Sequence, residues 1–563
     1  MRRKRYGPRV PHPVQQLVNY SVGGDVDIFR LRRNWGFLST LAAILVISSL
    51  TLWITGCGTA SSVSNATFTY SDLADPHSLD PAQVDDQTGA NIVTYLYDGL
   101  VSYDATTGEA KPDLAESWDI SDNATVFTFH LKKGSKFSNG REVKAQDFLY
   151  AWTRALDPAT KSETAQSVLG AIKGAQDVMA GKSRTLTGVE TPDDYTLKVT
   201  LVQPMADFIT FMGQPASMPV PKEEIDKPGA KFAEAPFGNG PFMVKEWRHN
   251  DAVVLTTNPD FSGTKPKISE VTVRIIPDSA TAVQELKAGN LDAVRGIKPG
   301  QVESLRNDSS VKLLDSPGSG GVRFLGFNIT SAPFDNATVR QAVAYAIDKQ
   351  TLADKVLQGR AQPADGIVPP SVFGHQSNAM PYNFDVEKAK SLLAQAGYPG
   401  GQGLPRLTLS YPNVSVSPDL AQAIQAQLKQ VGISVELQGL EPNTFTGQMM
   451  SGKLPIFVAS WQDVPVFDSY LYALFDSDNI GATDVFNYQN KDVDNLITKA
   501  RGTTDAGARN SLYNEAQSKI LADAPAVPLV FDKDVIPYSP KVTNMVYTPA
   551  GLFALNDITV STQ

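Results

Sequence analysis

The chain has 563 residues, of which 42% are hydrophobic and 19% are charged, and this balance excludes a disordered, collagen-like or coiled-coil protein. Its single cysteine excludes an intrachain disulfide and any cysteine-based zinc or iron–sulfur site. The net charge of −9 argues against a nucleic-acid partner. At roughly 150 residues per domain, the length predicts about three or four domains.

The first 56 residues differ from the rest in charge and hydropathy. They contain eight basic and two acidic residues, so the rest of the chain carries a net charge of −15. Residues 35 to 56 contain no charge and follow an arginine cluster at residues 30 to 33, which is the polarity of an export signal. This apolar run ends at Ile54-Thr-Gly-Cys57, which resembles a bacterial lipobox.

The lipobox resemblance implies that residues 1–56 are an export leader, cleaved before Cys57, and that Cys57 carries a lipid. The small polar residues at 57–65 suit a tether that holds a domain away from a membrane. We expect a lipoprotein of the Gram-positive type on the extracellular face of the cell membrane. An uncleaved transmembrane anchor remains an alternative, since about 20 apolar residues can span a bilayer. A third alternative is that the apolar run at residues 35 to 56 is a buried core segment.

From about residue 66 onward, strand-like and helix-like segments alternate. Period-two alternation predicts strands at residues 66–70, 126–131, 195–201, 407–411 and 434–438. Helical patterns predict helices at residues 143–156, 339–350, 386–396, 418–431 and 508–522. Asp385 is expected to cap the 386–396 helix, and Gly397 fits just past its end. This alternation predicts an α/β fold.

No catalytic signature accompanies these elements. The sequence has no nucleophile elbow, no phosphate-cradling loop and no metalloprotease helix. Its five histidines are widely scattered, so no metal site is predicted. We expect a protein that is not an enzyme and that needs no cofactor.

Several segments, each weak alone, occur in one order over about residues 66–562. In that order they resemble the extracellular solute-binding proteins, family 5, of oligopeptide and dipeptide ABC importers, whose Gram-positive members are lipid-anchored. The segments include Ser78-Leu-Asp-Pro81, Pro112-Asp-Leu-Ala-Glu-Ser-Trp118, Gly238-Asn-Gly-Pro-Phe242 and Pro333-Phe-Asp-Asn336.

This resemblance implies a two-lobed periplasmic-binding-protein-like fold of type II, with an extra inserted domain and hinge closure over the ligand. It implies a monomer that delivers peptides to a membrane permease and its ATPase. The implied domains are a discontinuous lobe I at residues 66–98, 213–316 and 530–563, an inserted domain II at 99–212, and lobe II, the third domain, at 317–529.

In peptide-binding relatives, a tryptophan is followed three residues later by an aspartate that pairs with the peptide ammonium group. Here Asp463 follows Trp461 by two residues, and Val464 and Val466 replace a tyrosine and a second aspartate of that pattern. Asp463 is the expected ammonium partner, because a desolvated ammonium needs a charge-assisted bond. Two alternatives for Asp463 remain open: its carboxylate could order a turn or cap a helix, or the protein could bind another class of ligand. Asp468 is a second candidate, and otherwise a cap for a helix at 469–475.

The resemblance also implies further ligand contacts on both lobes. Backbone groups around Ser460, Trp461 and Gln462 would pair with an extended ligand, which lets a site accept many side chains. Asp85 and Gln87 are expected to face them, although a solvated acidic loop is the alternative. Three residues that enter the third domain are also candidates, with a core role open for the two phenylalanines: Phe324, Phe327 and Asn328.

The altered segment at 461–468 leaves other ligands open on the same fold. Relatives of this family bind nickel complexes, haem, glutathione, oligosaccharides or signalling peptides. A secreted enzyme would need a nucleophile–base pair that the sequence does not offer. A purely structural surface protein does not agree with the hinge-type pattern.

Overall fold

The computed structural model describes residues 66–105, 107–121, 123–227, 231–316, 320–414, 416–548 and 551–561. These residues all lie in the compact unit Val63–Gln563. The expected leader, the tether and Cys57 lie outside the described residues. Within the described ranges, no helix has both the length and the apolar character that a membrane span requires.

A seven-stranded sheet is built around β1 (Thr67–Asp72), which pairs in parallel with the strands on both of its sides. Phe68 and Tyr70 of β1 are fully buried and pack edge-on against Phe553. The strand order is β12-β19-β11-β1-β10-β9-β8. The other strands are β8 (Phe242–Arg248), β9 (Ala252–Thr257), β10 (Glu270–Ile275), β11 (Ala293–Val294), β12 (Lys312–Ser316) and β19 (Asp534–Tyr538).

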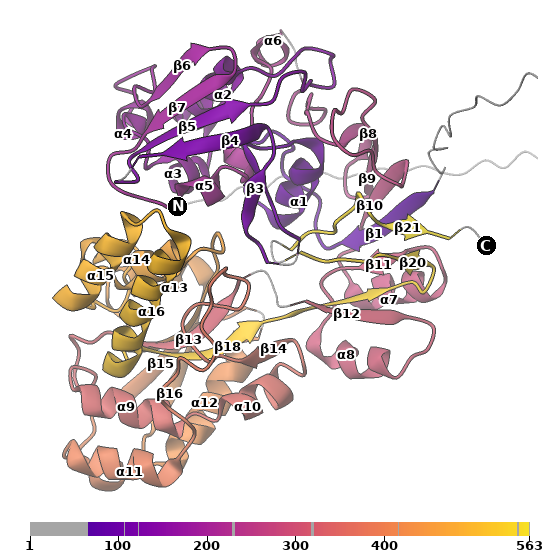
Figure 1. Ribbon diagram of the computed structural model, residues 1–563. Coiled ribbons are helices and arrows are strands. Elements are labelled where there is room, and N and C mark those ends of the chain that lie inside the picture. Colours follow the sequence, from indigo (N-terminus) through magenta and orange to yellow (C-terminus); the bar gives the residue numbers. More distant parts are fainter. Residues whose placement is uncertain are drawn as a thin grey trace, which may run out of the picture. The chain divides into compact units, whose positions relative to one another are not determined.

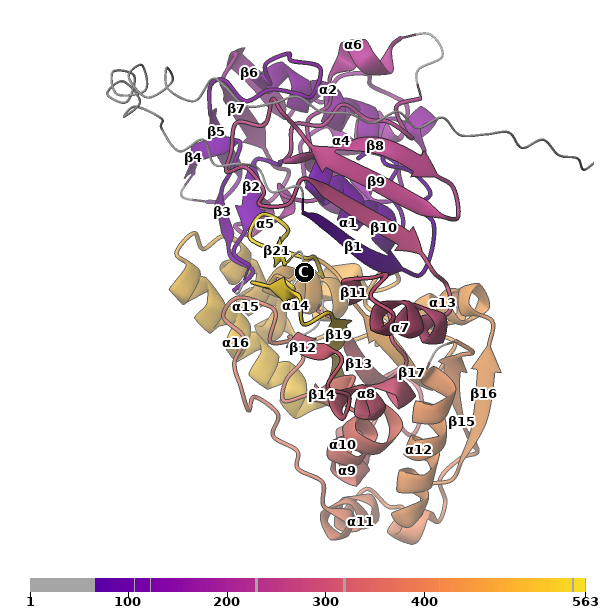
Figure 2. The ribbon, with the colours of Figure 1, turned by 90° about the vertical axis from the view of Figure 1, so that its right-hand side faces the viewer.

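A six-stranded sheet has the order β14-β18-β13-β17-β15-β16. Its strands are β13 (Val322–Phe327), β14 (Ala361–Pro363), β15 (Leu407–Pro412), β16 (Val435–Leu440), β17 (Ile456–Trp461) and β18 (Ala526–Asp532). The helix α12 (Ser417–Gln430) packs against β15 and β16, as Figure 2 shows. This sheet and its helices confirm the α/β layering that the sequence predicts.

A four-stranded antiparallel sheet forms a third group, in the order β4-β5-β7-β6 (Figure 1). Phe127 and Phe129 of β5 are buried, and Trp152 of α2 (Ala145–Leu156) donates its indole N–H to the carbonyl of Ser217 at 2.8 Å. The strands are β4 (Ala115–Ile120), β5 (Val126–Leu131), β6 (Val189–Asp193) and β7 (Thr196–Thr200). Two short pairs are β2 (Val101–Tyr103) with β3 (Ala110–Pro112), and β20 (Val542–Thr543) with β21 (Thr559–Val560).

The remaining helices are mostly short. They are α1 (Gln87–Leu96), α3 (Ala165–Leu169), α4 (Ala175–Met179), α5 (Phe208–Phe211), α6 (Lys222–Ile225), α7 (Ser279–Lys287), α8 (Pro299–Arg306), α9 (Ala337–Ala346), α10 (Lys349–Thr351), α11 (Val386–Gln395), α13 (Pro442–Met450), α14 (Phe467–Phe475), α15 (Lys491–Arg501) and α16 (Ala506–Asp523).

Local signals in the sequence set several of these boundaries. Asp385 caps α11 by accepting the N–H of Lys388 at 2.9 Å, and Gly397 beyond its end has a φ of +94°, so both expectations are confirmed. The helix expected at 339–350 is instead two helices. Ile347 is extended and ends α9. Asp348 then caps α10 by accepting the N–H of Thr351.

The chain passes from the seven-stranded to the six-stranded sheet between β12 and β13, and returns between β18 and β19 at Lys533. The domain boundary expected at residue 530 therefore falls inside β18. Arg323 donates to Asp532 at 2.7 Å, which ties β13 to the end of β18. Arg360 donates to the carbonyl of Ile297 at 2.5 Å.

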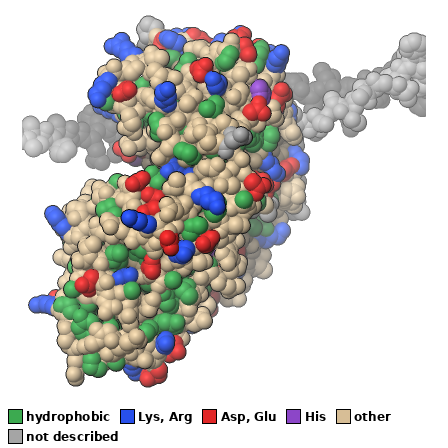
Figure 3. Space-filling view, turned by 60° about the vertical axis from the view of Figure 1, so that its left-hand side comes forward, with side chains coloured by type: hydrophobic (Ala, Val, Ile, Leu, Met, Phe, Trp, Pro, Cys, Tyr) green, Lys and Arg blue, Asp and Glu red, His purple; other side chains and the backbone are tan. Residues whose placement is uncertain are grey.

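Charged side chains of both signs are interspersed on the face drawn in Figure 3. That face presents no extended basic stripe of the kind that binds nucleic acid.

Candidate functional site

A cavity of about 510 Å³ has walls from residues 84–87 at the start of α1 and from residues 462–465 after β17. The helix α1 packs against β8 of the seven-stranded sheet, whereas β17 belongs to the six-stranded sheet. The cavity therefore lies between elements of the two sheets. Four expected ligand residues line it: Asp85, Gln87, Gln462 and Asp463.

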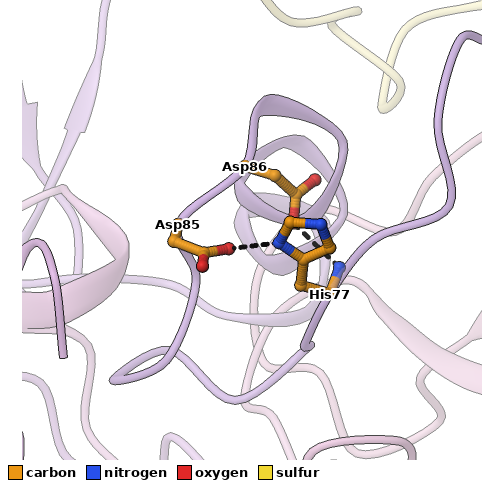
Figure 4. A group of neighbouring side chains, drawn as sticks. All are labelled: His77, Asp85 and Asp86. Carbon is orange, nitrogen blue, oxygen red and sulfur yellow. Dashed lines mark hydrogen bonds and ion pairs between the residues drawn. The ribbon is translucent and has the colours of Figure 1, made fainter. Parts of the chain in front are cut away.

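The wall at the start of α1 is held by a small network of hydrogen bonds. Asp86 caps α1 by accepting the N–H of Gly89 at 2.8 Å, and it also accepts the backbone N–H of His77 at 2.9 Å. The Nδ1 of His77 lies 2.8 Å from Oδ1 of Asp85 (Figure 4). The hydrogen bond to Asp85 raises the pKa of His77 above its ordinary value. Asp85 thus has a hydrogen-bond partner in His77.

The opposite wall is the loop after β17. The indole N–H of Trp461 donates to the carbonyl of Ser469 at 2.9 Å, which ties the end of β17 to α14. Asp463 accepts the N–H of Val464 at 2.6 Å. Burial raises the pKa of the Asp463 carboxyl above its ordinary value, and the charge of Asp468 adds to this effect.

Asp463 differs from Asp85 in having no basic side chain beside its carboxylate among the described residues. Among the described residues, no lysine, arginine or histidine forms an ion pair with its carboxylate. A partly buried carboxylate without a cation is costly, because its charged form has lost solvation without gaining a partner. The Asp463 side chain is therefore suited to a cationic ligand group.

Ser460 and Trp461 precede the cavity and do not line it. They pair on one side with Arg323 and Val322 of β13. On the other side, β15 pairs with β17 only at Ile456 and Phe457. Within the part of the chain that the structure describes, the β15-facing edge of β17 from residue 458 to 461 therefore has no strand partner. Such an edge can pair with an extended chain.

Three expected ligand residues do not reach the cavity. Phe324 is 4% exposed and packs edge-on against Phe457 and Phe486. Phe327 is fully buried and stacks on Phe334. The two phenylalanines are core residues because β13 is a central strand, which is the alternative that the sequence left open for them.

Asn328 is also structural. Its amide donates to the carbonyl of Gly452 at 2.7 Å, and its Oδ1 accepts the backbone N–H of Thr330 at 3.0 Å. These bonds use the side chain to order the turn after β13. Asn328 is 4% exposed and does not line the cavity, so its contact with a ligand stays a prediction.

Asp468 is not the cap of α14. Val466 occupies the cap position, and Asp468 lies in the first turn, so the expected cap is wrong. The Asp468 carboxylate is 3.0 Å from Arg501 and accepts the hydroxyl of Tyr513 at 2.9 Å. This buried ion pair already satisfies the carboxylate, which makes Asp468 a weaker ammonium candidate than Asp463.

Asn91 lines the cavity although the sequence analysis did not select it. It lies one helical turn after Gln87 on α1, and the Nε2 of Gln87 donates to its Oδ1 at 2.9 Å. The i,i+4 spacing is the sequence signal that indicates this contact, once the helix is assigned. Thr164 and Gln214 also line the cavity, and no local signal points to them.

A second cavity of about 560 Å³ adjoins the first and shares Tyr103, Gln214 and Pro465 with its lining. Its walls include Asp98, Asp113 and Lys132. Burial raises the pKa of Asp113 to about 6, with Lys132 acting in the opposite direction. The pKa of Asp98 is raised further, by burial and by the charge of Asp113.

The chain is similar to known proteins over most of its length. Residues 109–482 match the family described as bacterial extracellular solute-binding proteins, family 5 middle. The glutathione-binding protein GsiB of Escherichia coli strain K12 is 31% identical over 493 residues, covering 85% of this chain and 91% of GsiB.

Two solved structures are similar to most of the chain. One is the unliganded open form of the periplasmic murein tripeptide binding protein MppA, with a TM-score of 0.80, 26% identity, and coverage of 89% of this chain and 98% of MppA. The other is DppA from Helicobacter pylori in complex with the peptide STSA, with a TM-score of 0.69, 30% identity, and coverage of 88% and 98%. These matches confirm the resemblance drawn from the sequence and the two-lobed binding-protein fold.

Proposed function

Because the chain belongs to the bacterial extracellular solute-binding proteins of family 5, which bind solutes for ABC importers and are not enzymes, we propose that its solute is an oligopeptide with a free N-terminal ammonium group. The protein captures the peptide in the cavity of about 510 Å³ and delivers it to the membrane permease. Capture requires no chemical step. It requires only that one arrangement of the two lobes binds the ligand more tightly than the other.

One observation carries this proposal, namely the Asp463 carboxylate in the cavity wall without a cation beside it. An incoming ammonium group supplies the missing charge, and the exchange is favourable because the carboxylate is already desolvated. Asp85 is the less suitable partner, since His77 already forms a hydrogen bond with it at 2.8 Å.

The edge of β17 supports an extended ligand. Ser460 and Trp461 offer backbone groups next to Gln462 and Asp463, and no described strand occupies that edge. Main-chain pairing recognises the groups that all peptides share, so side-chain preference is weak. DppA, which shares the fold, is named as a complex with the tetrapeptide STSA.

The test is isothermal titration of the full-length chain with trialanine and with N-acetyl-trialanine. The parent should bind trialanine more tightly, and Asp463→Asn should weaken trialanine about tenfold or more while leaving the acetylated peptide nearly unchanged. Asp492→Asn is the matched control, because that carboxylate is 75% exposed. Equal affinity of the parent for the two peptides would refute the ammonium role.

Glutathione is the second candidate solute, favoured by the 31% identity to a protein named for binding it. It carries a free α-ammonium group and peptide linkages, so Asp463 would hold it in the same way. A thermal-shift comparison of reduced glutathione with trialanine separates the two, since the better ligand stabilises more at equal concentration.

We further propose that Cys57 is the lipidation point and that the body is held at the extracellular face of the membrane. The support is the lipobox-like Ile54-Thr-Gly-Cys57 after a charge-free run. Cys57→Ser should abolish lipid attachment and release the protein from the membrane fraction. A variant that stays as firmly bound as the parent would favour an uncleaved helix.

The domain assignment belongs to the same proposal. Lobe I comprises residues 66–98, 213–316 and 533–563, and domain II comprises 99–212. Lobe II comprises 317–532, because β18 ends at Asp532. The protein acts as a monomer that docks on a permease with its ATPase.

A further inference from the structure

The amide side chains of Gln87 and Asn91 lie one turn apart on α1, and both line the cavity of about 510 Å³. The Nε2 of Gln87 donates to the Oδ1 of Asn91 at 2.9 Å. This bond uses one donor of Gln87 and the carbonyl oxygen of Asn91. It leaves the amide nitrogen of Asn91 and the carbonyl oxygen of Gln87 for another partner.

The amide nitrogen of Asn91 has no hydrogen-bond acceptor among the described residues, although Asn91 is only 1% exposed. An unpaired buried donor is costly, so native proteins rarely keep one without a reason. The Gln87 side chain is exposed, and within the described ranges its Oε1 accepts no hydrogen bond. The pair therefore offers one donor and one acceptor next to each other.

A peptide group has the complementary arrangement, with a C=O acceptor and an N–H donor. We propose that the Gln87–Asn91 pair reads one peptide group of the bound ligand, with Asn91 donating to its carbonyl oxygen and Gln87 accepting its N–H. This inference rests on the proposed peptide function and narrows it. The site selects secondary amides, in addition to the ammonium group that Asp463 holds.

Gln87 and Asn91 have different roles in binding the peptide group, because one is exposed and the other is buried. Gln87 is exposed at the cavity, so its free carbonyl oxygen is accessible to the ligand N–H. Asn91 is buried in α1 and is kept in one orientation by the bond from Gln87. The bond between them fixes which end of each amide remains free.

The experiment compares trialanine with its two depsipeptide analogues, in which one amide N–H is replaced by an ester oxygen. Affinities are measured by calorimetry on the full-length chain. The parent should bind one of the ester analogues roughly five- to tenfold more weakly than trialanine, the range for one hydrogen bond. In Gln87→Ala this difference should vanish, because the acceptor that read the N–H is gone.

Asn91→Asp tests the other half of the pair. It keeps the shape of the side chain and replaces its donor by an acceptor, so trialanine and both esters should weaken together. Its melting temperature is measured in parallel, because Asn91 is buried. Gln83→Ala is the matched control, since Gln83 is an exposed glutamine that bonds to Thr160 and does not line the cavity.

The outcomes separate this inference from the function on which it rests. If the parent binds trialanine and both esters equally, the Gln87–Asn91 inference is overturned while the peptide function stands. An ester penalty that persists in Gln87→Ala overturns it as well. If trialanine does not bind at all, the peptide function fails and the inference fails with it.

Discussion

The Nε of Arg509 on α16 lies 2.9 Å from Oδ1 of Asp207, which directly precedes α5. Both side chains are nearly buried, and the adjacent N–H of Ala206 donates to the carbonyl of Arg501 at 2.8 Å. Burial raises the pKa of Asp207 to about 6 even though Arg509 acts in the opposite direction. This ion pair joins the chain just after the four-stranded sheet to α16, which lies between β17 and β18 of the six-stranded sheet.

Removing one partner of this ion pair should lower the free energy of unfolding. Arg509→Ala removes the ion-pair partner of the buried Asp207 carboxylate, and the free energy of unfolding should fall by about 3–5 kcal/mol. Urea denaturation measures the effect. Arg406→Ala is the control, because Arg406 pairs with Glu436 on an exposed surface and such pairs contribute about 0–1 kcal/mol. Equal losses in the two variants would contradict the special role of the buried pair.

Affinity for peptide should depend on pH through Asp463. Its pKa is raised by burial, and only the ionised carboxylate attracts an ammonium group. The peptide amine stays protonated as the solution is acidified from pH 7, so trialanine binding should weaken as Asp463 takes up a proton. Asp463→Asn should show a flatter profile over the same range. Parallel profiles for the parent and this variant would assign the pH dependence to another group.

Stability should respond to pH through Asp113 in the second cavity. Its folded-state pKa of about 6 lies above the ordinary value, so its contribution is fully present below about pH 4 and is lost as the pH rises through about 6. Asp113→Asn resembles the protonated form. It should match the parent near pH 4 and exceed its stability at pH 8 by about 1–3 kcal/mol.

Urea denaturation at the two pH values measures this difference. Glu387→Gln is the control, because that side chain is 82% exposed. A stability difference between Asp113→Asn and the parent that is constant across this pH range would show that the carboxyl group is not the titrating group.

Phe324 should matter for stability and not for ligand contact. Phe324→Ala removes a ring that packs against Phe457 and Phe486, and the free energy of unfolding should fall by about 3–5 kcal/mol. The folded fraction should bind trialanine with nearly the parent affinity in calorimetry. Phe384→Ala is the control, because Phe384 is 47% exposed. A large loss of affinity at unchanged stability would return Phe324 to the ligand site.

Part of the fold could be predicted from local features of the sequence. The alternation at residues 126–131 predicts β5 with its observed bounds, and the carboxylate of Asp385 marks the start of α11. Both signals act within a few residues, because strand alternation and helix caps are local properties. The continuous helix expected at 339–350 failed for the same kind of reason, since Asp348 offers a competing cap.

The sequence by itself determined the α/β class, the family resemblance and the four residues that face each other across the cavity, Asp85, Gln87, Gln462 and Asp463. Tertiary structure alone decided which of the other candidates are available to a ligand. Asp468 is satisfied by Arg501, and His77 forms a hydrogen bond with Asp85, while no described lysine, arginine or histidine pairs with Asp463. Burial and pairing depend on side chains brought together by folding, and a pattern along the chain does not contain that information.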